Sequence, residues 1–262
     1  RLALPVMAAP VGAMQLHYGD KYDDLTYNRL LLAACAKAGI VAFTGDGVDP
    51  AVMEGATQAI RTQQGCGVPT VKPWDRETLM QKLDLALTAD PMAIAMDIDA
   101  AGLSFLRNRM PPAGSKTVAE LREVAEHARK PFILKGIMTV RGAEKAVEAG
   151  ASAIVVSNHG GRVLDQCPAT AEVLPAIADA VGDRVMVLVD GGIRTGLDVF
   201  KALALGADGV LIGRPFVTMV YGGGEEGVAA YVRKLTDELS DTMAMCGAHS
   251  LKEIDREMLW QG

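Results

Sequence analysis

Short apolar segments alternate with longer amphipathic segments eight times along the 262 residues of this chain. The short segments are apolar throughout, which is the pattern of parallel strands buried on both faces. Three of the longer segments end in glycine just before the next strand, at Gly39, Gly150 and Gly206, as helices commonly do. Eight such units favour a closed (β/α)8 TIM barrel, an α/β fold, over an open doubly wound sheet, and we predict one domain over residues 1–262.

The bounds of the expected elements follow from where each pattern starts and stops. Strands are predicted at residues 4–8, 41–44, 67–71, 93–98, 132–135, 153–157, 185–190 and 209–212. Helices are predicted at residues 24–38, 50–61, 76–89, 118–128, 140–149, 169–181, 197–205 and 225–246. A short lid is expected after the fourth strand, at residues 100–115. In such a barrel the functional side chains gather at the C-terminal ends of the strands.

Charge and hydropathy argue against some classes of protein. The net charge is −6 and no basic stripe occurs, so nucleic-acid binding is not expected. No apolar run reaches transmembrane length, and no signal-peptide pattern opens the chain. The four cysteines are scattered without CxxC spacing, so we expect free thiols and a cytoplasmic location. Because the chain starts at Arg1 and residues 2–9 already have a buried-strand pattern, we expect a further N-terminal segment before it.

Two loops at the predicted rim carry the same pairing of glycine with arginine. Residues 190–196 (DGGIRTG) follow the seventh strand, and residues 212–215 (IGRP) follow the eighth. Glycine lets backbone N–H groups approach a phosphate, a helix N-terminus adds partial positive charge, and Arg194 and Arg214 add full charges. We therefore predict a phosphate site between these two loops, where barrels often have one.

A further glycine-rich run at residues 222–227 matches the dinucleotide pattern GxGxxG. Glu225 and Glu226 would repel a pyrophosphate, and no later strand completes a βαβ unit. We predict that this run is a flexible lead-in to the last helix.

The sixth predicted strand runs directly into polar residues, among them His159 and Arg162. At one rim these two supply a proton acceptor and a guanidinium that can clamp an anion. A carboxylate partner fixes the tautomer of a histidine and stabilises its protonated form, and Asp99, after the fourth strand, is placed to do this for His159. The pattern indicates an enzyme acting on a small anionic substrate.

The motif at residues 157–165 (SNHGGRVLD), together with residues 133–137 (ILKGI) and the two rim loops, closely resembles the FMN-dependent α-hydroxy-acid oxidases and dehydrogenases. The resemblance is dense from about residue 131 to 255, and weaker but in register from 4 to 99. It implies that His159 is the catalytic base, that Arg162 holds the substrate carboxylate, and that Asp99 orients His159. It also implies an FMN site made of Ala9, Pro10, Thr44, Lys135, Ser157, Asp190, Gly191, Gly192, Arg194, Gly213 and Arg214.

The activity that the resemblance implies is oxidation of a small L-2-hydroxy acid, lactate- or glycolate-like, to the 2-oxo acid on FMN. Lys135 would lie near flavin N1 and O2, where its charge stabilises the reduced ring. The electron acceptor stays open between oxygen, a quinone and an electron-transfer protein, and a homo-oligomer (tetramer or octamer) is expected. Two alternatives remain: an FMN barrel of other chemistry, resembling isopentenyl-diphosphate isomerase, and a flavin- or hydroxy-acid-binding protein without turnover.

The chain also departs from the family pattern near the flavin. Lys72 stands where the family has a neutral glutamine, and Asp97 stands near the family's threonine, so we expect these two to form an ion pair beneath the flavin. Asp97 with Asp99 suggests a metal pair, but a metal site needs more ligands, and we predict none. The family carries a second carboxylate-binding arginine in its lid, and the arginines of the shorter segment here are Arg107 and Arg109. His17, His127 and His249 are expected at the surface or at helix caps.

Overall fold

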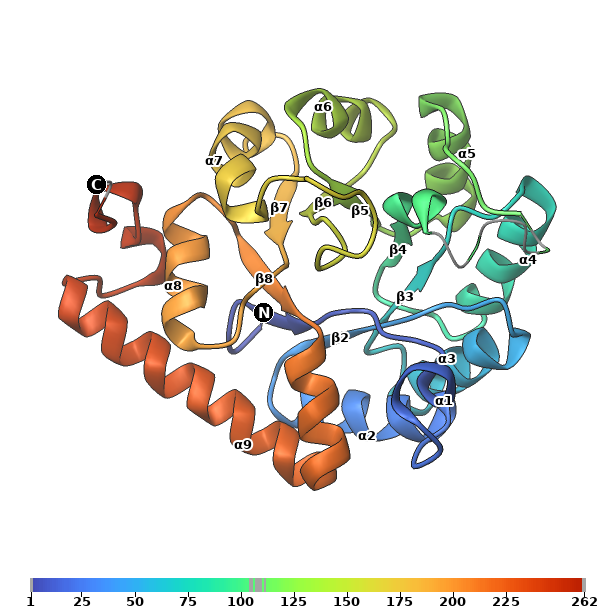
Figure 1. Cartoon of the computed structure of the whole chain (residues 1–262), viewed down its shortest axis with the longest axis horizontal. Coiled ribbons are helices and arrows are strands. Elements are labelled where there is room, and N and C mark those ends of the chain that lie inside the picture. Colours follow the sequence, from blue (N-terminus) through green and yellow to red (C-terminus); the bar gives the residue numbers. More distant parts are fainter. Residues whose placement is uncertain (1, 104–105, 107–109, 111, 261–262) are drawn as a thin grey trace.

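The computed structural model describes residues 2–103, 106, 110 and 112–260. Within them, eight parallel strands close into one barrel in chain order, with a ring of helices outside (Figure 1), which confirms the predicted fold. The barrel closes where β1 pairs with β8, with Val6 opposite Val210. The strands are β1 (Val6–Ala8), β2 (Val41–Thr44), β3 (Val68–Val71), β4 (Ile94–Asp97), β5 (Phe132–Ile137), β6 (Ala153–Val156), β7 (Met186–Val189) and β8 (Gly209–Ile212).

Alternate residues of each strand face two different apolar clusters. In β6, Ala153 and Val155 belong to the small cluster that fills the barrel, whereas Ile154 and Val156 belong to the large cluster between the strands and the helices. The strands are therefore buried on both faces, as their unbroken apolar pattern predicts. Side chains of a strand alternate between the two faces, so the side chain at the end of a strand points to the same face as the side chain two positions earlier.

The helices outside the barrel match the predicted amphipathic segments in position, with most bounds within two residues. Six of the helices in the described residues are preceded by an aspartate or threonine whose side chain accepts from a backbone N–H of the first turn, such as Asp75 and Thr117. The helices are α2 (Asp24–Lys37), α3 (Pro50–Thr62), α4 (Arg76–Leu87), α5 (Val118–Ala128), α6 (Val140–Glu148), α7 (Thr170–Val181), α8 (Gly196–Ala204) and α9 (Arg214–Cys246). None of the helices in the described part of the chain is both apolar enough and long enough to span a bilayer.

Two helical segments differ from the sequence prediction. A short helix, α1 (Met14–Tyr18), follows β1 where none is predicted. The last helix begins at Arg214 rather than at residue 225, and it kinks at Gly224, whose φ is +54°. The prediction of a flexible lead-in at residues 222–227 is therefore wrong, because this glycine run lies inside α9 and supplies its bend.

The segment after β4 was predicted to be a short lid. It starts with a 3-10 turn, η1 (Ile98–Gly102), and its far end is tied to the β3–α4 connection. Asp75 N donates to Pro112 O, and Gly114 N donates to Pro73 O. Arg107 and Arg109 lie outside the described residues.

Candidate active site

A cavity of about 1100 Å³ opens at the C-terminal rim of the barrel, within the described residues. It is lined by the ends of several strands and by the loops that follow them, which is where barrel enzymes place their chemistry. Its size suits a mononucleotide-sized ligand together with a small substrate. Most of the predicted site residues line it: Ala9, Pro10, Lys135, His159, Arg162, Asp190, Gly191, Gly192, Arg194, Gly213 and Arg214.

Four charged residues, from the three adjacent strands β3, β4 and β5 and from β7, form the floor of this cavity. Lys72, Asp97, Lys135 and Asp190 follow the inward positions of β3, β4, β5 and β7, since Val68, Ala95, Ile133 and Leu188 all belong to the inner cluster. Because side chains alternate between the two faces of a strand, these four charged side chains point into the mouth of the barrel.

The floor charges are paired with one another. Lys135 Nζ lies 3.1 Å from Asp97 Oδ1 and 3.5 Å from Asp190 Oδ2, and Lys72 Nζ lies 3.9 Å from Asp97 Oδ2. The geometry bears out the predicted ion pair between Lys72 and Asp97. Burial alone would raise the pKa of Asp97, but attraction to Lys135, then to His159 and Lys72, outweighs burial and lowers it. Burial would likewise lower the pKa of Lys135, yet Asp97 and Asp190 raise it.

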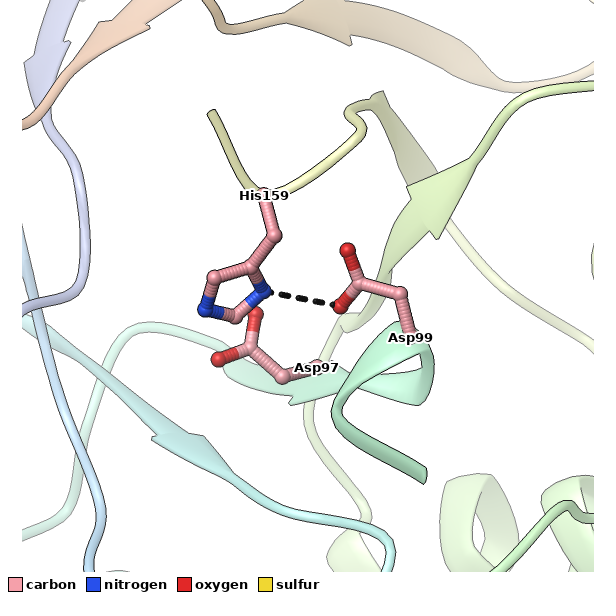
Figure 2. A group of neighbouring side chains, drawn as sticks. All are labelled: Asp97, Asp99 and His159. Carbon is pink, nitrogen blue, oxygen red and sulfur yellow. Dashed lines mark hydrogen bonds and ion pairs between the residues drawn. The ribbon is translucent and has the colours of Figure 1, made fainter. Parts of the chain in front are cut away.

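His159 is held by its own loop and by Asp99. Its backbone has φ +58°, a left-handed conformation that histidine adopts more readily than bulky residues, and its N–H donates to Ser157 Oγ at 3.1 Å. Its Nδ1 lies 3.1 Å from Asp99 Oδ1, and the other ring nitrogen points away from that carboxylate (Figure 2). With the proton assigned to Nδ1, Nε2 is left as an acceptor.

Gly136 allows Asp99 to reach the histidine. Its φ is +104°, and β5 is irregular there, because the pairing with β6 shifts between Lys135 and Ile137. A Cβ at Gly136 would lie 2.6 Å from Asp99 Cγ. Any side chain at this position would therefore push Asp99 out of its place beside His159.

Arg162 and His17 line the same cavity from opposite parts of the chain, the β6–α7 loop and α1. Burial, followed by the positive charges of Arg162 and Lys72, lowers the pKa of His17. His17 therefore lies close enough to Arg162 and Lys72 to interact with them electrostatically. His17 is exposed, as predicted, but its place at the cavity has no signal in the sequence, because it depends on the unpredicted helix α1.

The predicted phosphate loops meet at one side of the cavity. Gly191 and Gly192 have φ of +99° and +80°, and a Cβ on Gly192 would meet no other atom within 4 Å, so the backbone there is open to a ligand. Gly213 precedes α9 and offers no side-chain cap, and the positive end of that helix faces the cavity through Gly213, Arg214 and Pro215. Arg194 and Arg214 add their charges to the same wall.

Three predicted site residues do not line the cavity. Asp99 acts on it through His159, and Ser157 lies beneath the loop whose backbone it supports. Thr44 belongs to the outward-facing register of β2, since Ala42 lies in the outer cluster, and its buried hydroxyl has no hydrogen-bond partner among the described residues.

Asp97, Asp99 and His159 also lie close enough to offer one ligand atom each within 4.8 Å of one another (Figure 2). Two lysines already share the Asp97 carboxylate, and their positive charges oppose a metal ion there. We therefore assign the three side chains to proton handling and to ligand binding.

The residues fit an FMN cofactor. The arginines and open glycine backbone of the phosphate wall suit a phosphate dianion, and the buried Lys135 suits a ring that gains negative charge on reduction. Asp190 Oδ1 is buried without a partner among the described residues, at the edge of the same wall.

The model of the FMN-dependent dehydrogenase family matches residues 107–261. The chain is 44% identical over 146 residues to a 2-hydroxyacid oxidase of Dictyostelium discoideum, covering 56% of this chain and 38% of that protein. It is 48% identical over 135 residues to glycolate oxidase of Spinacia oleracea, covering 50% of this chain and 37% of that protein. The chain thus spans less than two fifths of the length of these curated relatives.

Solved structures cover more of the chain. A mandelate oxidase structure superposes with a TM-score of 0.79 at 32% identity, over 98% of this chain and 78% of that one. A mandelate oxidase with (S)-4-hydroxymandelic acid superposes with a TM-score of 0.80 at 29% identity, over 98% and 79%. The whole described barrel therefore has a counterpart, including the weaker N-terminal half.

Proposed function

The chain belongs to the FMN-dependent dehydrogenase family, and from that premise we propose that it oxidises a small L-2-hydroxy acid to the corresponding 2-oxo acid. One observation carries the proposal: His159 and Arg162 line the same cavity as Lys135 and the two phosphate loops. A base and a carboxylate clamp thus share one space with a site that suits a flavin.

His159 is the base in this proposal. Asp99 accepts from Nδ1, which fixes the ring and leaves Nε2 to take one proton from the substrate. Asp99 also stabilises the imidazolium that results, since its carboxylate lies 3.1 Å from Nδ1. Bound FMN supplies the acceptor for the two electrons that leave the substrate.

Arg162 and Lys135 stabilise negative charges, those of the substrate carboxylate and of the reduced flavin. The planar guanidinium of Arg162 suits bidentate binding of the substrate carboxylate, and this fixes the carbon to be oxidised beside His159. Lys135 stays positively charged in the floor, because Asp97 and Asp190 raise its pKa. Its charge is therefore in place before the reaction, with no reorganisation needed.

The experiment is anaerobic mixing of the purified, FMN-loaded protein with L-lactate, glycolate and larger 2-hydroxy acids. Bleaching of the flavin absorbance by an L-hydroxy acid supports the proposal, and His159→Ala should keep the flavin but lose the bleaching. A yellow protein that no hydroxy acid bleaches would instead support a binding protein, and bound flavin that reacts only with a prenyl diphosphate would support the isomerase alternative.

We also propose oxygen, a quinone or an electron-transfer protein as the electron acceptor, a homo-oligomeric assembly and a cytoplasmic location. Four free cysteines, one of them buried, support a reducing compartment. Reoxidation of the bleached enzyme by air, by a soluble quinone or by neither distinguishes the three acceptors, and light scattering gives the assembly.

A further inference from the structure

Three adjacent strands end in an alternating row of charges. Lys72 directly follows β3, Asp97 ends β4 and Lys135 lies within β5, and their exposed fractions are 7%, 6% and 3%. All three line the cavity. Asp97 stands between the two lysines, because each of its oxygens faces one of them.

The row has unused hydrogen-bonding capacity. Lys72 Nζ is 3.9 Å from Asp97 Oδ2, which is beyond a hydrogen bond, and no acceptor for its three N–H groups lies among the described residues. Asp97 Oδ1 is buried, and although it lies 3.1 Å from Lys135 Nζ it has no hydrogen bond of good geometry from the described residues. The row therefore has donors and an acceptor that a ligand in the cavity can use.

A buried hydrogen-bond network around Asp46 holds Lys72 in place. The backbone N–H of Lys72 donates to Asp46 Oδ2 at 3.0 Å, and the indole of the fully buried Trp74 donates to the same oxygen at 2.6 Å. Lys82 donates to the other oxygen, Asp46 Oδ1, at 2.5 Å. The end of β3 is therefore anchored by a satisfied buried network, which holds Lys72 in position.

We propose that Lys72, Asp97 and Lys135 form a donor–acceptor–donor row that binds the imide edge of the flavin ring, the edge made by one carbonyl, the N3–H group and the second carbonyl. The inference rests on FMN as the cofactor of the proposed function. The imide edge presents acceptor, donor and acceptor in that order, so the row is complementary to it. A carboxylate accepts only, and therefore demands a hydrogen on N3.

At two of the three positions, those of Lys72 and Asp97, this chain has a charged residue where the family resemblance predicts a neutral one. A charged acceptor discriminates more sharply than a neutral one, because a ligand without the matching hydrogen leaves a buried carboxylate unpaired. The chain should accordingly reject a flavin that carries a methyl group on N3.

The test is a binding measurement that does not depend on turnover. The full chain is titrated with FMN and with 3-methyl-FMN, and flavin fluorescence gives both dissociation constants. We expect 3-methyl-FMN to bind ~100-fold or more weakly than FMN. Equal binding of the two flavins by the unaltered chain overturns the inference, whatever the behaviour of any variant.

Variants separate the roles within the row. Asp97→Ala should weaken FMN binding and reduce the discrimination to less than ~10-fold, whereas Lys72→Met should weaken both flavins together and keep it. Lys145→Met, an exposed lysine on α6, is the matched control and should change neither constant. Discrimination that survives Asp97→Ala overturns the assignment of N3–H to Asp97.

Failure of the inference and failure of the proposed function are distinguishable. A chain that takes 3-methyl-FMN as readily as FMN, yet is bleached by hydroxy acids, contradicts only the inference. A chain that rejects 3-methyl-FMN but is never bleached contradicts only the oxidation.

Discussion

Replacement of Lys135 by methionine tests the charge pairing of the cavity floor most severely. The side chain is 3% exposed, and its ammonium lies 3.1 Å from Asp97 Oδ1 and 3.5 Å from Asp190 Oδ2. Methionine keeps much of the length of the side chain and removes only the charge. Lys135→Met therefore leaves two buried carboxylates with Lys72, 3.9 Å from Asp97, as the nearest remaining cation of the floor.

The expected loss of stability follows from these pairs. Removing one partner of a buried ion pair costs ~3–5 kcal/mol, because the other charge stays buried. For 262 residues, an unfolding entropy of ~2.1 cal/mol/K per residue gives ~550 cal/mol/K. The melting temperature of Lys135→Met should therefore fall by about 5–9 °C.

The pH dependence has a defined sign. The pKa of Asp97 is lowered in the folded chain, so its stabilising effect is present above the unfolded value, ~3.9, and is lost as the pH falls through the lower folded value. In Lys135→Met the main cause of that lowering is gone, and burial favours the protonated acid. The variant should accordingly lie closer to the unaltered chain at pH 5 than at pH 8.

The assay is thermal unfolding of the flavin-free chain followed by circular dichroism. Lys145→Met, which removes an exposed charge, should shift the melting temperature by no more than about 1 °C. Asp97→Asn added to Lys135→Met should recover part of the loss by neutralising one carboxylate. If Lys135→Met melts together with the Lys145→Met control, the floor charges do not interact as described.

Three further results are expected. Gly136→Ala should keep FMN but slow flavin reduction by ~10-fold or more in stopped flow, because the new Cβ displaces Asp99 from His159. Gly150 is the control position: its φ is also positive, at +85°, but a Cβ there meets no such clash, so Gly150→Ala should not slow flavin reduction. Arg162→Lys should raise the dissociation constant of oxalate by ~10-fold or more in a spectral titration and leave FMN affinity unchanged, since a point charge replaces a planar fork; an unchanged oxalate constant refutes the clamp. Oxalate binding should also take up protons between about pH 5 and 7, because the bound anion offsets the positive charge of Arg162, which together with burial lowers the pKa of His17. Calorimetry in buffers of different ionisation enthalpy detects this uptake, and a binding heat that is the same in every buffer contradicts it.

The sequence predicts those parts of the fold that depend on local periodicity. Unbroken apolar runs identify the eight strands, and the barrel then places His159, Lys135 and the two phosphate loops at one rim. Thr44 shows the limit of this reasoning, because one residue of register decides whether a strand-end side chain faces the cavity or the helices.

Contacts between distant segments could not be predicted in the same way. Whether Asp99 reaches His159 depends on the irregular turn at Gly136, and whether His17 reaches the cavity depends on a five-residue helix too short to show a periodic pattern. The kink at Gly224 lies in a glycine run that looks like a loop in the sequence, although the residues on both sides of it are helical.

A crystal structure of the FMN-loaded chain with oxalate tests the central claim most directly. We expect the phosphate between Gly192 and Arg214, the imide edge of the flavin on the row of Lys72, Asp97 and Lys135, and the oxalate held by Arg162 beside Nε2 of His159. A flavin whose phosphate lies elsewhere, or an oxalate out of reach of both His159 and Arg162, would contradict it.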